Sequence, residues 1–348
     1  MKERTKSSCP DRMMDRRAFL RFSGVLGIGL FSAGLAPVAA EAVKFNRRLY
    51  KVSETRLAMG TFVSMTLIHP SRDEAQQAMG QAFEEIDRLS GLLSRFGDQT
   101  ALAMLNREGY LRDVPPELHH VLERSLDYYR LSGGAFDVTV KPIVDLFQES
   151  VGAKGKAMPP RRKLREAAQL VGSDKIELER RGIRFRRPGM GITLDGIAKG
   201  YIVDRASGLL AKKGVQNHLV NAGGDIMTRG SKSENKPWTI AIEDPSKNKN
   251  YPDVIHVRTG GVATSGNYEI YFDREKMFHH IVDPRTGLSP ELNTSVSVRA
   301  RSAMEADALA TGVFVMHPKE GTAFIDSIGQ CEGLVIARNG TLWRSRGW

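Results

Sequence analysis

Residues 279–287 read His-His-Ile-Val-Asp-Pro-Arg-Thr-Gly, which places two histidines, an aspartate and an arginine at the end of a strand-like run. Asp283-Pro284 followed by Gly287 predicts a turn, because proline fixes φ and glycine permits positive φ. Reactive side chains at a strand-to-loop junction are common in functional sites. An imidazole titrates near neutral pH, so this segment could supply a base or a metal ligand. An ordinary solvated strand edge is the alternative interpretation.

Asp307 and Thr311 form a second candidate site. They are four residues apart in an expected helix, Ala303–Met316, and this spacing places a carboxylate and a hydroxyl one turn apart on one face. Both are hard oxygen donors that suit Mg²⁺ or Ca²⁺ and suit zinc poorly. A polar pair lining the core is the alternative. Because the rest of the helix is small and apolar, an inward-facing aspartate would need a partner.

Glycine-rich turns suggest close approach of the backbone to a ligand. They are Ser132–Asp137, Thr193–Gly200, Asn221–Asp225 and Thr264–Tyr268. Thr193–Gly200 also brings Lys199 to an expected helix start, where free N–H groups and the helix dipole bind anions. The order of a Walker loop is absent. Several such turns, a lysine, an oxygen-ligated metal and a histidine together predict a ligand that contains a pyrophosphate.

Serine hydrolysis is the competing chemistry, with Ser265 as nucleophile and His280 and Asp283 as its partners. The sequence lacks the G-x-S-x-G pattern and the strand–elbow–helix context of such a serine. We therefore favour the metal and pyrophosphate interpretation.

Hydrophobic periodicity predicts the elements that would position these residues. A strand is expected over 56–69, helices over 72–94, 116–132, 161–170, 197–211 and 303–316, and a surface loop over 150–160. Short strands are expected over 175–194 and 216–301. Helix pairs mixed with short, turn-rich strands indicate an α+β fold with antiparallel sheet. No dinucleotide-binding G-x-G-x-x-G follows a strand, and no fixed-period repeat is found.

Residues 1–40 have the features of an export signal. Arg16-Arg17 lies in a twin-arginine pattern ahead of an apolar run, and small residues at 38–42 offer cleavage sites. The run is shorter than the about 20 residues that a spanning helix needs. No cysteine follows it, so a lipoprotein is not expected. Cys331 remains alone in the mature chain, residues 41–348, and cannot form an internal disulfide.

The charge of the mature chain is moderately basic. The whole chain carries a formal +11, of which the first 40 residues contribute +4, which leaves about +7. This balance suits an anionic ligand. Because basic and aromatic residues are not interleaved, we expect no nucleic-acid partner.

The motifs, in this order, resemble the ApbE family of FAD:protein FMN transferases. The matching segments are Met59–Thr61, Ser94–Phe96 with Leu105-Asn106, Ser132–Asp137, Gly196–Gly200, Asn221–Asp225, Ala263–Tyr268, His280–Gly287 and Ala306–Thr311. The resemblance implies a two-lobed, T-fold-like α+β domain over residues 41–348, with antiparallel sheets, flanking helices and FAD in the cleft between the lobes. It also implies Mg²⁺-dependent transfer of FMN from FAD to a threonine or serine of an acceptor protein, with release of AMP.

Residue roles follow from the resemblance by position. It implies FAD contacts from Met59, Phe96, Ala135, Phe136, Asp137, Thr193, Lys199 and Ile281. It implies a metal held by the side chains of Asp307 and Thr311 and the backbone carbonyls of Gly196 and Ala310. His280 is then expected to take the proton from the acceptor hydroxyl, in preference to His279, and Asp283–Gly287 becomes the turn that holds this base.

Two positions depart from the family pattern. Phe96 stands where a tyrosine is frequent, which keeps ring stacking and removes a phenol. Thr193 stands where a carboxylate is frequent. A threonine at this position resembles the pattern of the NosX-type branch of the family. The expected partners are the twin-arginine machinery and an acceptor such as a NosR-like, Rnf-like or Nqr-like membrane redox subunit, and the expected location is the periplasm. An FAD pyrophosphatase and a non-enzymatic FAD carrier remain as alternatives.

Overall fold

One antiparallel sheet dominates the part of the chain that the computed structural model describes, which is residues 14–15, 38–44, 48–154, 159–233, 235–245, 250–267 and 281–348. Its nine strands run in the order β16-β15-β14-β13-β9-β8-β4-β3-β2. Their bounds are β2 Val38–Lys44, β3 Tyr50–Ala58, β4 Thr61–His69, β8 Asn217–Ala222, β9 Asp225–Arg229, β13 Gly260–Gly266, β14 Asn293–Ala300, β15 Glu332–Ala337 and β16 Leu342–Arg344. β2 therefore begins within the stretch that offers the expected cleavage sites.

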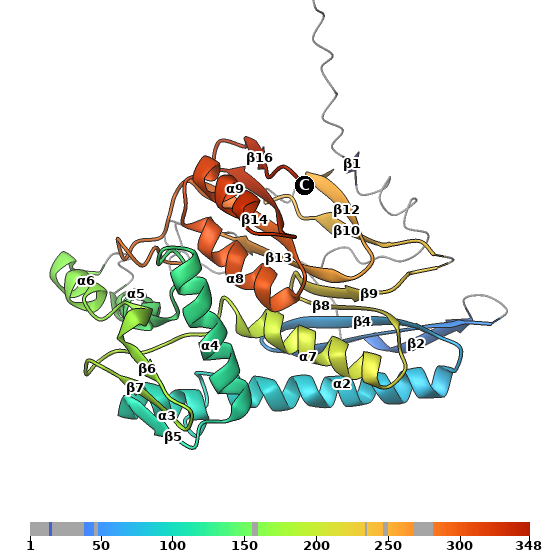
Figure 1. Ribbon diagram of the computed structural model, residues 1–348, viewed down its shortest axis with the longest axis horizontal. Coiled ribbons are helices and arrows are strands. Elements are labelled where there is room, and N and C mark those ends of the chain that lie inside the picture. Colours follow the sequence, from blue (N-terminus) through green and yellow to red (C-terminus); the bar gives the residue numbers. More distant parts are fainter. Residues whose placement is uncertain are drawn as a thin grey trace, which may run out of the picture.

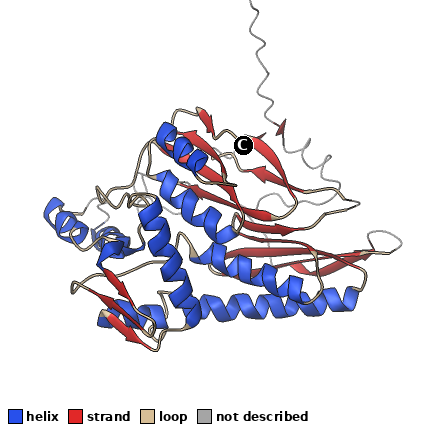
Figure 2. Ribbon diagram, in the orientation of Figure 1, coloured by secondary structure: helices blue, strands red, loops and turns tan. Residues whose placement is uncertain are grey.

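Helices cover one face of this sheet (Figures 1 and 2). α2 (Arg72–Leu93), α7 (Ala198–Lys212) and α8 (Ala303–Phe314) pack side by side on it, and α9 (Pro318–Ser327) packs on β15. Strand β4 shows why the sheet has two buried faces. Val63, Met65 and Leu67 alternate toward the helices, whereas Ile68 faces the other side. There it packs in a cluster with Trp238 of the hairpin β10 (Trp238–Ile242) and β12 (Asp253–Val257).

A second group of elements extends from one end of the helical layer (Figure 1). It contains α3 (Ala101–Glu108), α4 (Pro116–Leu131), η1 (Val138–Val140), α5 (Lys141–Lys154), α6 (Arg161–Ala168) and η2 (Ser173–Lys175). A small antiparallel sheet of β5 (Tyr110–Arg112), β7 (Gly182–Phe185) and β6 (Ile176–Leu178) completes it. A two-residue strand, β1 (Met14–Asp15), pairs with β11 (Asn250–Tyr251) apart from both sheets.

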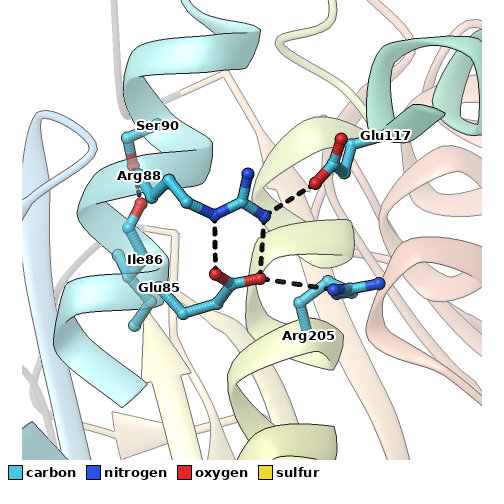
Figure 3. Close-up of polar contacts among 6 residues, drawn as sticks. All are labelled: Glu85, Ile86, Arg88, Ser90, Glu117 and Arg205. Atoms are coloured by element: carbon cyan, nitrogen blue, oxygen red, sulfur yellow. Dashed lines mark hydrogen bonds and ion pairs between the residues drawn. The ribbon is translucent and has the colours of Figure 1, made fainter. Parts of the chain in front are cut away.

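Capping and charge fix the helical layer. The Ser71 hydroxyl accepts the backbone N–H of Glu74 at the start of α2, and the Ser302 hydroxyl accepts that of Glu305 at the start of α8. Figure 3 shows an ion-pair network that ties α2, α4 and α7 together. Its members are Arg88, Glu85, Glu117 and Arg205, and the hydrogen bond from Arg88 lowers the pKa of Glu85.

Several expected elements are confirmed, among them the helices that became α2, α4, α6, α7 and α8, and the α+β class with antiparallel sheet. The single strand expected over 56–69 is wrong, because β3 and β4 form a hairpin that turns at Met59 and Gly60. The loop expected over 150–160 is also wrong at its start, because α5 continues to Lys154. The helices α3, α5 and α9 were not expected.

Cys331 is a free, buried cysteine, and burial raises the pKa of its thiol to about 12. The thiolate that could react is therefore scarce at neutral pH. Among the described residues, no helix combines the length and apolar character needed to cross a membrane.

Candidate active site

One pocket brings together most of the residues that the sequence singled out. It lies where η1, the 193–200 segment, the end of β13, residues 281–284 and α8 meet. The expected residues in its wall are Ala135, Phe136, Asp137, Thr193, Gly196, Lys199, Ile281, Asp307 and Thr311. Met59, Phe96 and Ala310 are not part of this wall.

Oxygen donors gather on one side of the pocket. The Asp307 carboxylate is buried, and the Thr311 Oγ1 atom lies one helical turn away on α8. Ser265 Oγ on β13 is 3.2 Å from Thr311 Oγ1. A Cβ on Gly196 would come within 2.8 Å of the same Oγ1, so only glycine lets this backbone approach so closely.

This donor set fits a hard divalent cation. Asp307, Thr311 and the Gly196 backbone offer a carboxylate, a hydroxyl and a carbonyl, the ligand types that Mg²⁺ or Ca²⁺ prefer. Ala310 lies in the same turn of α8 and is fully buried. Among the described residues, no group of three or more His, Cys, Asp or Glu side chains is arranged to hold a metal ion.

Asp307 also has a structural partner. Its Oδ2 atom accepts the backbone N–H of Gly200 at 3.1 Å, in the first turn of α7. This N–H is one of the groups that a helix leaves without an internal acceptor, and the preceding Ile197 provides no side-chain cap. The carboxylate is thereby aimed at the pocket by the start of a second helix.

Lys199 provides the positive charge of the pocket. Its Nζ atom lies 2.8 Å from Asp225 Oδ2, and the side chain retains 32% exposure. Asp225 follows the Gly223-Gly224 turn, where both glycines have positive φ. The turn that the sequence marked as a backbone approach therefore positions the lysine.

Asp137 is held within the pocket wall. Its Oδ1 atom accepts from the hydroxyls of Thr139 (2.5 Å) and Ser173 (2.7 Å) and from the Thr139 backbone N–H (2.8 Å), and Oδ2 accepts the Ser173 N–H at 3.2 Å. Burial raises the pKa of Asp137, and these hydrogen bonds oppose that shift. The carboxylate thus fixes the turn after α6 against the pocket.

Phe136 and Thr193 shape the wall through local hydrogen bonds. Phe136 N donates to the Ser132 hydroxyl at 2.9 Å, and its ring packs edge-on against Tyr128. Gly133 and Gly134 both have positive φ, as the glycine turn predicted, and the segment leads into η1. Thr193 N donates to Val138 O at 2.8 Å, and its hydroxyl accepts Asp195 N at 3.3 Å.

Phe96 lies outside the pocket wall and is 76% exposed. The guanidinium of Arg95 stacks on its ring, with Cζ 4.4 Å from the centroid. Arg95 is itself nearly buried and lies 3.3 Å from Asp195, a residue of the wall, and 3.7 Å from Asp145 on α5. No role was predicted for Arg95, yet its side chain connects Phe96 to Asp195 in the pocket wall.

Met59 adopts a strained backbone. It has φ 54° and Gly60 has φ 69°, the combination that a two-residue hairpin turn requires at both central positions. A methionine with positive φ is uncommon, and such strain is concentrated at functional sites. Gly223 N donates to Phe62 O at 3.2 Å, which sets this hairpin beside the turn that leads to Asp225.

The turn after the histidines is well defined. Arg285 donates to both oxygens of Asp283, at 3.0 and 3.1 Å, and its Nη2 atom donates to Val315 O at 3.0 Å near the end of α8. Gly287 has positive φ and donates to Asp283 O. His279, His280 and Tyr268 lie outside the described residues. Because the Asp283 carboxylate is paired with Arg285, the turn role expected for Asp283 fits this geometry better than a place in a hydrolytic triad.

The pattern of chemistry-bearing segments matches a known family model. The model of the ApbE family matches residues 59–335, which includes the whole pocket wall, the small three-stranded sheet and the large sheet from β4 to β14. The chain belongs to the ApbE family.

Relatives of this ApbE-family chain include two proteins named FAD:protein FMN transferase. The one from Haemophilus influenzae is 32% identical over 248 residues, covering 67% of this chain and 72% of that protein. The one from Vibrio cholerae is 32% identical over 253 residues, covering 70% and 75%. The crystal structure of the ApbE protein from Thermotoga maritima superposes with a TM-score of 0.77 at 28% identity, covering 86% of this chain and 97% of that one.

Proposed function

We propose that this protein transfers FMN from FAD to a threonine or serine hydroxyl of an acceptor protein, with a divalent cation, Mg²⁺, and release of AMP. The observation that carries the proposal is the pocket that sets the Asp307 and Thr311 oxygens beside Lys199, in a chain of the ApbE family. The names of the two curated relatives support the same reaction.

The reaction replaces the phosphoanhydride bond between the two halves of FAD with a phosphoester bond to the acceptor. The acceptor oxygen forms a bond to the phosphorus of the FMN half of FAD, and the bond from that phosphorus to the oxygen of the AMP half breaks. The hydroxyl proton leaves to a base, and AMP departs with the bridging oxygen. A magnesium ion, when bound, neutralises charge on the pyrophosphate oxygens.

This chain's own residues position those groups. Asp307, Thr311 and the backbone of Gly196 and Ala310 would hold the cation, and Lys199 would add positive charge beside the pyrophosphate. Phe136, Ile281 and Thr193 form the walls, and Met59 and Phe96 contact the flavin nucleotide from outside the pocket. His280 accepts the hydroxyl proton, because an imidazole can do so near neutral pH.

The direct test combines purified protein, FAD, Mg²⁺ and a periplasmic acceptor domain. We expect a fluorescent acceptor band after denaturing electrophoresis and AMP in the supernatant. AMP release without any acceptor would identify an FAD pyrophosphatase instead. FAD binding with no AMP under either condition would identify a carrier.

The proposal also includes the cellular location of this protein. Arg16-Arg17 directs export through the twin-arginine machinery to the periplasm, where the acceptor is a membrane redox subunit of NosR-like, Rnf-like or Nqr-like type. Replacing both arginines by lysine should leave the precursor in the cytoplasm. Periplasmic protein in that variant would contradict the export route.

A further inference from the structure

One segment, residues 161–187, has a marked excess of cations over anions and is here called the basic segment. It contains α6, η2, β6 and β7. Its 27 positions hold ten Lys or Arg residues and four Asp or Glu residues, a net +6. Residues 41–348 as a whole carry about +7, the chain's +11 less the +4 of the first 40 residues. The net charge of this segment is thus close to that of residues 41–348 as a whole, because cations and anions nearly balance in the rest.

Most of these cations face the solvent. The exposed ones are Arg161, Arg162, Lys163, Arg165, Arg180, Arg181, Arg184, Arg186 and Arg187. Arg186 pairs with Glu177 at 3.1 Å, and Arg162 lies 3.7 Å from Glu166. With ten cations against four carboxylates, the segment cannot neutralise itself. Its surface presents a surplus of guanidinium groups, which favour carboxylate partners.

The residues at the start of α6 are unfavourable for helix stability. Arg161, Arg162 and Lys163 occupy the first turn, where the positive end of the helix dipole disfavours cations. This turn has no acidic residue, and Pro160 at the N-cap provides no side-chain hydrogen bond. By contrast, α2 begins with a Ser71 cap, Asp73 and Glu74. A local rule broken without a structural gain is expected where a surface serves a function.

α6 is attached directly to the wall of the active-site pocket. Leu164 on its buried face packs in one cluster with Val144 and Val282, and both of these valines line the pocket. In the middle of the segment, Ser173 donates to the Asp137 carboxylate in the same wall. Through Leu164, α6 is therefore connected to the pocket wall by direct packing, and its exposed cations lie on the same short helix.

We propose that the basic segment is the docking surface for the acceptor protein, which presents an acidic face beside its flavin-accepting hydroxyl. This inference rests on the proposed transfer reaction, since the acceptor must approach this pocket. Opposite charge accelerates encounter and fixes orientation. An anionic membrane is the less suitable partner, because Leu164 and Ala167 of α6 are buried and the helix has no apolar face to insert.

The test compares two triple variants that each remove three exposed charges. Arg161→Gln/Arg162→Gln/Arg165→Gln changes α6. Arg72→Gln/Lys212→Gln/Lys213→Gln, at the start of α2 and at the end and C-cap of α7, is the matched control. At low salt we expect the α6 variant to raise KM for the acceptor domain about tenfold, with kcat and FAD affinity unchanged. Its Tm should be equal or higher, because two cations leave the first turn of the helix. The control should match the wild type, and added salt should reduce the difference.

Binding of the acceptor domain to the FAD-free protein is measured in parallel, with the wild-type domain and a domain whose surface carboxylates are amidated. Unchanged KM and unchanged binding in the α6 variant would overturn the inference while the transfer reaction stands. If the wild type bound the acceptor domain in a charge-dependent way but transferred no flavin to it, the proposed function would be overturned. The assignment of the docking surface would still stand. Loss of binding only to vesicles containing phosphatidylglycerol would assign the surface to the membrane and overturn the inference.

Discussion

Asp204 and Asp307 each cap the helix on which the other residue stands. Asp307 on α8 accepts Gly200 N at the start of α7, and Asp204 on α7 accepts Ala303 N at 2.8 Å and Met304 N at 2.9 Å at the start of α8. The two helices approach so closely that a Cβ on Gly200 would lie 2.4 Å from Ala303 O. The carboxylate expected to bind the cation is therefore also part of a helix junction.

Because Asp307 has both roles, a substitution that keeps its hydrogen bond but removes its charge tests the metal role separately from the structural role. Asp307→Asn keeps an oxygen that can accept Gly200 N and removes the negative charge. We expect transfer to fall about 100-fold or more while Tm changes little. Initial rates across a Mg²⁺ titration, with FAD affinity from flavin fluorescence, measure both effects. Full Mg²⁺-dependent turnover in the variant would remove the metal role from this residue.

Asp204 and His218 should oppose each other in their effect on stability between about pH 4 and 6. Burial raises the pKa of Asp204 from 3.8 to about 6, so the stability it contributes is present at low pH and is lost as pH rises through about 6. Burial lowers the pKa of His218 from 6.5 to about 4, so its contribution is present above pH 6.5 and is lost as pH falls through about 4. His218 accepts from or donates to Ser207 at 2.7 Å in a buried site.

Removing either side chain should reveal the pH dependence of stability that the other contributes. Asp204→Asn should give a Tm that rises from pH 4 to 6.5 by about 5 °C more than that of the wild type. His218→Gln should give the opposite trend over the same range. Differential scanning calorimetry at half-unit pH steps measures both slopes. Parallel profiles for the wild type and the two variants would contradict the assignment.

Met59→Gly should relieve strain and weaken cofactor binding. The backbone at φ 54° suits glycine, so we expect stability to stay within about 1 kcal/mol of the wild type. Loss of the side chain should raise the Kd for FAD about tenfold, as expected for one buried apolar contact. Gly60→Ala is the contrasting variant, because it places a Cβ at φ 69° and should destabilise the hairpin. Undiminished FAD affinity in Met59→Gly would argue against the predicted contact.

Arg95→Met should disturb FAD binding without touching the catalytic oxygens. The guanidinium supports the exposed ring of Phe96 and reaches Asp195 in the pocket wall. We expect KM for FAD to rise several-fold with a smaller change in kcat. Arg95→Lys should recover only part of the loss, because an ammonium cannot stack on the ring and reach both carboxylates. Equal KM in all three proteins would show that Arg95 has no positioning role.

His280→Gln should abolish transfer while FAD binding persists, because the proton acceptor is lost and the pocket wall remains. The pH–rate profile of the wild type should rise with deprotonation of one group near neutral pH. His279→Gln is the matched control and should retain activity. Reversed effects in the two variants would exchange the assigned roles.

Much of the helical layer was predictable because its apolar residues recur at helical spacing, as Ile86 and Leu89 do along α2. The β3–β4 hairpin was not, since Met59 takes a conformation that a sequence pattern assigns to glycine or asparagine. α5 was missed because Pro142 near its start and Gly152 near its end are typical of loops. Tertiary packing decides the structure of such segments.

In the candidate site too, contacts within one helix could be predicted from the sequence, whereas contacts between distant segments could not. Asp307 and Thr311 could be paired from sequence because both lie on one helix. Ser265 was considered only as a nucleophile, yet it contacts Thr311 across 46 positions of chain. Arg95 and Asp225 carry no motif that links them to Asp195 and Lys199. Contacts between distant strands and loops depend on sheet order, which residue types alone do not define.

The Asp307–Gly200 hydrogen bond affects how distant members of this fold can be interpreted. A lineage that lost the enzymatic reaction would still be under pressure to keep an acceptor at position 307, because the α7–α8 junction depends on it. Among the hydrogen bonds of the described residues, the Thr311 hydroxyl caps no helix and its partner is Ser265. In surveys for inactive descendants, the side chain at position 311 should therefore discriminate better than that at position 307 between chains that keep and chains that lose the proposed metal site.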